Sequence, residues 1–134
     1  MKNDKILILK RGDELISKIV DYCGKNKIQS GWFYGIGAAK SAKLGFYDLR
    51  KKEYIFKELT DNYEITNISG NITMKESEII IHCHASLSDI NMNSFGGHVQ
   101  ELIVSGTCEI LIKKCEKKMI RKYNIITGLN LIEN

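Results

Sequence analysis

Only one stretch of this sequence has the hydrophobic spacing of a helix, and nearly all that follows it has the composition of β-strands. Five apolar residues recur at helical spacing and would form one core-facing stripe: Leu15, Ile16, Ile19, Val20 and Cys23. Gly12-Asp13-Glu14 is predicted to open this helix, because acidic residues suit the positive end of the helix dipole. Gly24 or Asn26 is predicted to end it.

The rest of the chain is predicted to form strands. The expected strands cover residues 5–10 before the helix and residues 32–36, 42–48, 53–59, 62–74, 78–87, 97–104, 107–114 and 119–126 after it. Residues 38–41 are predicted to form a turn or a short helix, and Gly70 to mark a bend or bulge. One helix followed by many strands with short turns indicates an α+β fold, with a largely antiparallel central sheet and one main N-terminal helix packed on it.

Length and composition fit a single domain over residues 1–134. No stretch of the sequence approaches the roughly 20 apolar residues of a membrane helix, and the N-terminus lacks the pattern of a secretory signal. We therefore expect a cytoplasmic protein without a membrane partner. Its four cysteines form no CxxC pair, so in that compartment they are expected to be buried or idle thiols.

The net charge of +4 arises largely from a basic stretch late in the chain. Its members are Lys113, Lys114, Lys117, Lys118, Arg121 and Lys122. A solvated hairpin explains them most simply, and a footprint for phosphate groups of DNA is the alternative. Glu116 lies within this stretch, and Glu109 lies shortly before it. The aromatic run Trp32-Phe33-Tyr34 is predicted to serve the core and a subunit interface rather than to stack on bases.

The strongest chemical signal is the sequence His82-Cys83-His84 inside the predicted strand 78–87. Side chains alternate between the two faces of a strand, so His82 and His84 project to one side and Cys83 to the core. Their Cα atoms would then be about 6.5–7 Å apart, a span that two imidazoles can close on one metal ion.

The third histidine, His98, follows the glycine pair Gly96-Gly97. These glycines permit close packing against another strand, and a chain reversal after Ser88 would bring His98 beside the other two. The alternative is that all three are hydrogen-bonded polar residues on an exposed sheet face. The same pattern also occurs in cupin-like metal sites, so it does not define a fold.

If a metal binds, three neutral imidazoles favour Zn²⁺, with nickel, copper or iron as alternatives. Three protein ligands leave a fourth position open, which is typical of catalytic rather than structural zinc. A water there would have a lowered pKa and could act as a nucleophile, assisted by a carboxylate. The candidate carboxylates are Asp89, Glu101, Glu64 and Glu109, and the sequence does not choose among them.

Several motifs resemble those of the PPC (plant and prokaryote conserved) domain family. In chain order they are Arg11-Gly12-Asp13-Glu14-Leu15, Gly35-Ile36-Gly37-Ala38, Tyr63-Glu64-Ile65 with Gly70-Asn71-Ile72, Ile81-His82-Cys83-His84-Ala85-Ser86-Leu87, Gly96-Gly97-His98 and Thr107-Cys108-Glu109-Ile110. Their order and spacing extend over nearly the whole chain. The resemblance implies an α+β unit that assembles as a homotrimer, with His82, His84 and His98 as its metal site.

Prokaryotic members of this family are often labelled as DNA-binding, and plant members carry AT-hooks outside the domain. This sequence contains no proline, so it has no Arg-Gly-Arg-Pro core of an AT-hook, and insertion of an arginine arm into the minor groove is unsupported.

Three functions therefore remain open. The first is a homotrimeric metalloprotein, an enzyme or a binder of an unidentified small ligand. The second is a DNA-associated regulator without an AT-hook. The third is a trimeric scaffold with structural metal.

Overall fold

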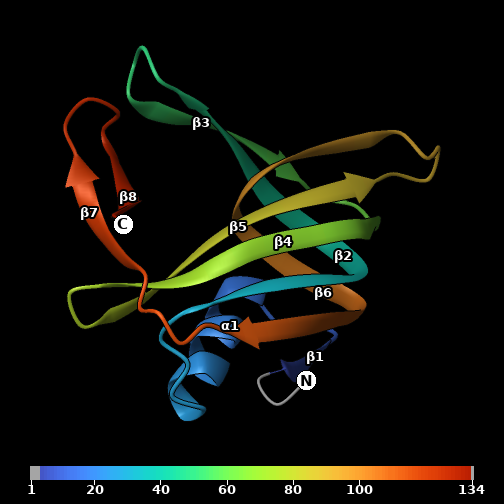
Figure 1. Ribbon diagram of the computed structural model, residues 1–134. Helices are drawn as coiled ribbons and strands as arrows, with labels where there is room; N and C mark the ends of the chain where they lie inside the picture. Colours follow the sequence, from blue (N-terminus) through green and yellow to red (C-terminus); the bar gives the residue numbers. More distant parts are fainter. Residues whose placement is uncertain (1–3, 134) are drawn as a thin grey trace.

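Eight strands pair into one mostly antiparallel sheet, and a single helix packs against it (Figure 1). The computed structural model describes residues 4–133. The elements are β1 (Asp4–Lys10), α1 (Leu15–Lys25), β2 (Gly31–Asp48), β3 (Glu53–Leu59), β4 (Tyr63–Lys75), β5 (Glu78–Ser88), β6 (Ser94–Lys114), β7 (Ile120–Asn124) and β8 (Leu129–Glu133). The predicted α+β class, the single helix and the mostly antiparallel sheet are confirmed. No helix in the part of the chain that the structure describes is long and apolar enough to cross a membrane.

The helix begins where the sequence predicts, with Glu14 as its N-cap. The Glu14 carboxylate accepts hydrogen bonds from the backbone N–H groups of Ile16 and Ser17, which have no partner within the helix. Asp13 lies before the helix, where its carboxylate accepts a hydrogen bond from the Lys10 backbone. The helix ends at Lys25, and Asn26, one of the two predicted stops, is its C-cap.

Two long strands, β2 and β6, hold the sheet together. The first part of β2 lies between β4 and β6, and its last part lies between β3 and β6. The predicted turn or short helix at residues 38–41 is therefore wrong, because these residues continue β2. The predicted strands 97–104 and 107–114 are likewise one strand, β6, since both pair with β2.

The irregularity in the pairing of β2 with β4 coincides with glycines, whereas the irregularity in the pairing of β4 with β5 does not. The register of β2 against β4 shifts between Gly35 and Gly37, as the glycine content of this stretch predicts. The bulge predicted around Gly70 is wrong, because Gly70 pairs regularly with Cys83. The irregularity in β4 falls between Ile65 and Asn67 instead.

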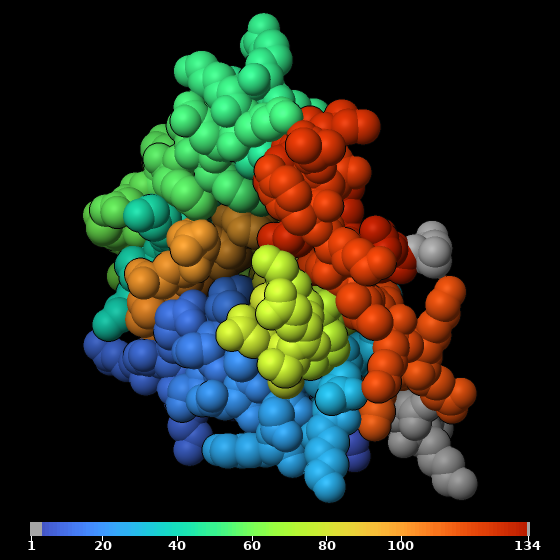
Figure 2. Space-filling model, turned by 90° about the vertical axis from the view of Figure 1, so that its left-hand side faces the viewer, coloured from blue at the N-terminus to red at the C-terminus, as the bar shows by residue number. Residues whose placement is uncertain are grey.

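The C-terminal hairpin of β7 and β8 was not predicted, since residues 119–126 were expected to form one strand. β7 ends at Asn124, whose side-chain oxygen accepts a hydrogen bond from the Thr127 backbone, and Gly128 has φ of 75°. One parallel pair, Met74 with Ile120, joins the hairpin to β4. Its tip lies beside the β2–β3 region (Figure 2), where the Tyr47 hydroxyl donates to the Thr127 carbonyl at 2.7 Å.

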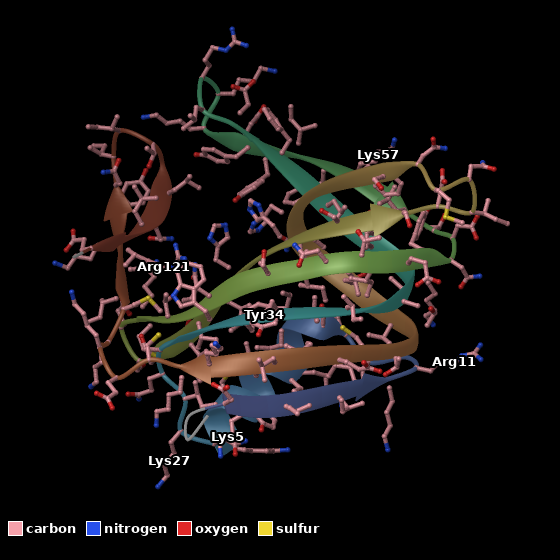
Figure 3. The ribbon with its side chains drawn as sticks, turned by 45° about the vertical axis from the view of Figure 1, so that its right-hand side comes forward. Lys5, Arg11, Lys27, Tyr34, Lys57 and Arg121 are labelled. Atoms are coloured by element: carbon pink, nitrogen blue, oxygen red, sulfur yellow. The ribbon has the colours of Figure 1, made fainter. Side chains whose placement is uncertain are left out.

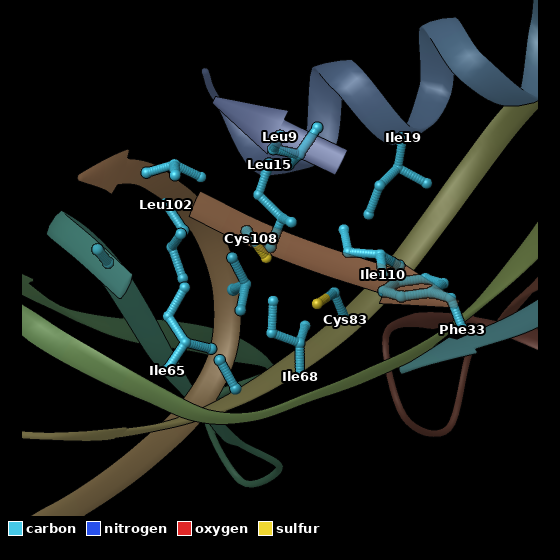
Figure 4. Close-up of a cluster of buried hydrophobic side chains, with 14 of the residues drawn as sticks. Leu9, Leu15, Ile19, Phe33, Ile65, Ile68, Cys83, Leu102, Cys108 and Ile110 are labelled. Atoms are coloured by element: carbon cyan, nitrogen blue, oxygen red, sulfur yellow. The ribbon is translucent and has the colours of Figure 1, made fainter. Parts of the chain in front are cut away.

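The two faces of the sheet differ in what covers them. On one face Trp32, Tyr34 and Ile36 of β2 are at least half exposed, and Figure 3 labels Tyr34 there. On the other face, buried side chains pack against α1 (Figure 4). These include Phe33, Ile68, Cys83 and Ile110, together with Leu15 and Ile19 of the helix.

Candidate metal centre

Strand β5 places His82 and His84 on one face of the sheet, as predicted. Between them Cys83 points the other way and is 1% exposed. Burial raises the pKa of the Cys83 thiol to about 12, so it stays protonated at neutral pH. The core position of Cys83 therefore leaves two imidazoles, and no thiolate, on the open face.

His98 joins them from β6 as the direct cross-strand partner of His84. The glycine pair before it explains the close approach of the neighbouring strands. A Cβ atom at Gly96 would lie 2.6 Å from the Ala85 carbonyl oxygen, and one at Gly97 would lie 2.8 Å from the Gly45 carbonyl oxygen. The structure thus brings together all three histidines that the sequence selects.

The three imidazoles are close enough to share one ion. One ring nitrogen from each of His82, His84 and His98 lies within 4.8 Å of the others. Nitrogens around a tetrahedral zinc are roughly 3.4 Å apart, so small side-chain rotations would close the group on the ion. Within residues 4–133, the buried Nδ1 atom of His98 has no hydrogen-bond partner, which fits an atom that coordinates a metal.

The surroundings of His82 and His98 favour the neutral form of these two rings. Burial is the main cause that lowers the pKa of His82 from 6.5 to about 4, and the charge of Arg121 and the other two imidazoles contribute to the same shift. Burial and His84 lower the pKa of His98 in the same direction. Neutral imidazole is the form that binds metal, so these two rings are ready to coordinate at pH 7.

No carboxylate belongs to the group of ligand atoms found within residues 4–133, which consists of the three histidines alone. A divalent ion held there would keep a coordination position open for a ligand and would act as a Lewis acid toward it.

The four predicted helper carboxylates are spread over the fold. Asp89 organises the β5–β6 loop, where it accepts hydrogen bonds from the Asn91 and Asn93 backbones. Glu64, Glu101 and Glu109 are exposed on strands. None of the four is among the ligand atoms of the histidine group.

Three residues around the histidines were not singled out as site residues by sequence reasoning. The Tyr54 ring stacks on His98 with centroids 4.7 Å apart. Asn71 is the cross-strand partner of His82. Arg121 extends from β7 toward the sheet (Figure 3) and donates to the Asn71 side chain. The basic stretch of the sequence contains Arg121, but nothing local separates it from its exposed neighbours.

A small cavity opens beside the site. It has a volume of about 270 Å³ and is lined by Trp32, Ser69, Gly70, Asn71, His82 and His84. Trp32 pairs with Asn71 and Asn71 with His82, and directly paired residues project from the same face of a sheet. The cavity and the two imidazoles therefore lie on the exposed face that carries Trp32.

Residues 2–116 match the model of the family described as the Plants and Prokaryotes Conserved (PCC) domain, which is the PPC family that the motifs resemble. The chain belongs to this family. No curated protein matches the sequence.

Solved PPC-like structures share the whole fold. A metal-containing protein from Archaeoglobus fulgidus is 32% identical, with a TM-score of 0.92 over 98% of this chain and 93% of the other. A PPC protein from Pyrococcus horikoshii is also 32% identical, with a TM-score of 0.91 over 98% and 91%. A protein from Bacteroides thetaiotaomicron, provisionally named as DNA-binding, is 26% identical, with a TM-score of 0.95 over 99% and 93%.

Proposed function

We propose that this PPC protein binds a divalent metal ion, Zn²⁺ in particular, through His82, His84 and His98. The observation behind this proposal is the convergence of three ring nitrogens within 4.8 Å. The Archaeoglobus fulgidus relative, named as metal-containing, supports it. Three neutral imidazoles suit zinc best among the ions usually available to proteins, and the open position would bind, or act on, a small ligand in the adjoining cavity.

Metal analysis of protein purified without added metal tests this proposal. We expect about one zinc per chain in the wild type and almost none in the H82A/H84A double variant, because one remaining imidazole cannot hold the ion. Ser86→Ala is the matched control. Ser86 is exposed two residues after His84 on the same strand, and its substitution should leave the metal content unchanged. Full metal content in the double variant would contradict the proposal.

We further propose that the chain forms a homotrimer through the open face of its sheet. Ile6 and Ile8 of β1 lie on this face with Trp32, Tyr34 and Ile36, and all five side chains are at least half exposed. Contiguous apolar surface of this kind is typical of association sites.

We also propose that the protein works in the cytoplasm. The four free cysteines of the chain suit that reducing compartment.

Light scattering after size exclusion tests the assembly. The change Ile36→Lys, on the open face, should reduce the particle mass from three chains to one, because it places a charge in the interface. Ile55→Lys is the control, since Ile55 is similarly exposed but lies on β3. Equal masses for the wild type and Ile36→Lys would contradict this assignment.

DNA association is a second candidate function. It is supported by the provisional name of the Bacteroides thetaiotaomicron relative and by the exposed members of the basic stretch, Lys113, Lys114, Lys117, Lys118 and Lys122. Binding through these lysines would weaken steeply with added salt as phosphate contacts are lost. A gel-shift titration at low salt tests it, and no shift there would remove this candidate.

A further inference from the structure

Arg121 is a buried cation without an anionic partner in the described part of the chain. Its side chain reaches from β7, beyond the family match at residues 2–116, and is 8% exposed. The guanidinium donates to the Thr73 hydroxyl at 2.9 Å, the Asn71 side-chain oxygen at 2.8 Å and the Asn130 carbonyl at 2.7 Å. All three acceptors are neutral. An arginine has five N–H donors, so one on each terminal nitrogen is left for a ligand.

This guanidinium is linked to the metal centre through Asn71. Asn71, which orients it, is the direct cross-strand partner of His82 and lines the same cavity. The charge of Arg121 is near enough to contribute to the lowered pKa of His82, and it also acts on Tyr54, the ring stacked on His98. The C-terminal hairpin thus brings a fixed positive charge to a site formed by β5 and β6.

The charges at this site do not balance. The ion pairs within residues 4–133 involve Lys18, Lys43 and Lys122, and Arg121 belongs to none of them. The ligand group contains no carboxylate either. A divalent ion beside Arg121 would therefore gather about three positive charges around neutral side chains, an arrangement that is costly in a half-buried place unless an anion joins it.

We infer that the ligand of this site is a small carboxylate, and that Arg121 selects it. One carboxylate oxygen would occupy the open metal position, and the free N–H groups of Arg121 would attract the other. The cavity of about 270 Å³ suits a molecule of a few heavy atoms. This inference rests on the proposed metal site, because the carboxylate is expected to bridge the ion and the guanidinium.

The test uses Co²⁺-loaded protein, whose visible spectrum reports ligands entering the metal. Acetate is the probe, and acetamide is its neutral counterpart of nearly the same shape. In Arg121→Gln we expect acetate affinity to fall about tenfold or more, with acetamide affinity unchanged. Co²⁺ affinity without acetate should be equal or higher, because removing a nearby positive charge removes repulsion. Damage to the fold would instead weaken both metal and acetate binding.

Two further variants separate charge from structure. Arg121→Lys keeps the positive charge, so it should lose less acetate affinity than Arg121→Gln. Lys122→Gln removes the neighbouring exposed cation, which pairs with Glu133, and should change acetate affinity less than twofold. Equal acetate affinity in the wild type and Arg121→Gln would overturn the inference, as would equal losses in the Gln and Lys variants.

A crystal structure of the Co²⁺-loaded wild type with acetate decides the case without any variant. We expect an acetate oxygen about 3 Å from a terminal nitrogen of Arg121. Acetate bound to the ion but turned away from Arg121 would overturn the inference and leave the metal site intact. Failure of the wild type to bind Co²⁺ at all would instead contradict the proposed function.

Discussion

The two faces of the central sheet are made from alternating residues of the same strands, yet they have different roles. Phe33 is 1% exposed and packs in the core, whereas the next residue, Tyr34, is 50% exposed on the open face. In β5 the same alternation sends Cys83 to the core and both neighbouring histidines to the open face. One face therefore holds the buried core, and the other carries the three histidines and exposed apolar side chains.

The two faces also differ in whether they contain polar side chains that need hydrogen-bond partners. The face under α1 is apolar, so its groups need no hydrogen-bond partners. The open face carries polar side chains that need partners, such as Asn71, and Arg121 of the C-terminal hairpin supplies the hydrogen bond to Asn71. We expect substitutions on the two faces to separate stability from function.

The largest effect should come from Phe33→Ala compared with Tyr34→Ala. Removing the buried ring leaves a cavity and should lower the free energy of unfolding by about 3–5 kcal/mol. Tyr34→Ala should cost about 1 kcal/mol or less in the isolated chain, and any larger loss should depend on protein concentration because it acts through association. Urea denaturation at two protein concentrations measures both. Similar, concentration-independent losses would contradict the division between the faces.

Metal removal should give the next largest effect. An ion at 100 times its dissociation constant stabilises the folded chain by about 2.7 kcal/mol, so chelation should lower the melting temperature by several degrees. The variant His84→Ala should melt at a temperature that chelator does not change. An equal response to chelator in the wild type and His84→Ala would show that the effect arises elsewhere.

A smaller effect should appear as a pH dependence of the metal-free protein. His82 has a pKa of about 4 in the fold against 6.5 ordinarily, so between these values the unfolded chain binds a proton that the folded chain does not. Stability should therefore fall as the pH is lowered from about 6.5 toward 4. Urea midpoints at several pH values should show a weaker decline in His82→Gln. The same decline in both proteins would remove His82 as a cause.

The smallest effect should come from Lys122→Gln. Lys122 is exposed and pairs with Glu133 across the C-terminal hairpin, and exposed pairs contribute little. We expect its melting temperature to stay within about 1 °C of the wild type. In Arg121→Gln, on the same strand, the hydrogen bonds to Asn71 and Thr73 would be lost, so thermal melting should show a clear decrease. Equal melting temperatures for the two variants would contradict the buried role of Arg121.

Periodic segments and the histidine group could be predicted from the sequence because their signals are local. Helical spacing gives α1, and alternation around His82 and His84 gives their common face. The position of Arg121 could not be predicted, since its burial is decided by docking of a hairpin onto β4 far away in sequence. Asn124 and Gly128 were the available signals for the turn of that hairpin.

The continuous strand β2 could not be predicted either. Residues 38–41 include two alanines and a lysine, which have little strand preference, and pairing with β4 and β6 decides their conformation. Pairing with the neighbouring strands therefore outweighs the weak strand preference of these residues.

Anomalous diffraction at the zinc edge, on crystals of protein purified without added metal, tests the central claim most directly. We predict one strong peak about 2.0–2.1 Å from a ring nitrogen of each of His82, His84 and His98. A site without a peak, with zinc absent from the dissolved crystals and the three imidazoles bound only to water or to one another, would contradict the account.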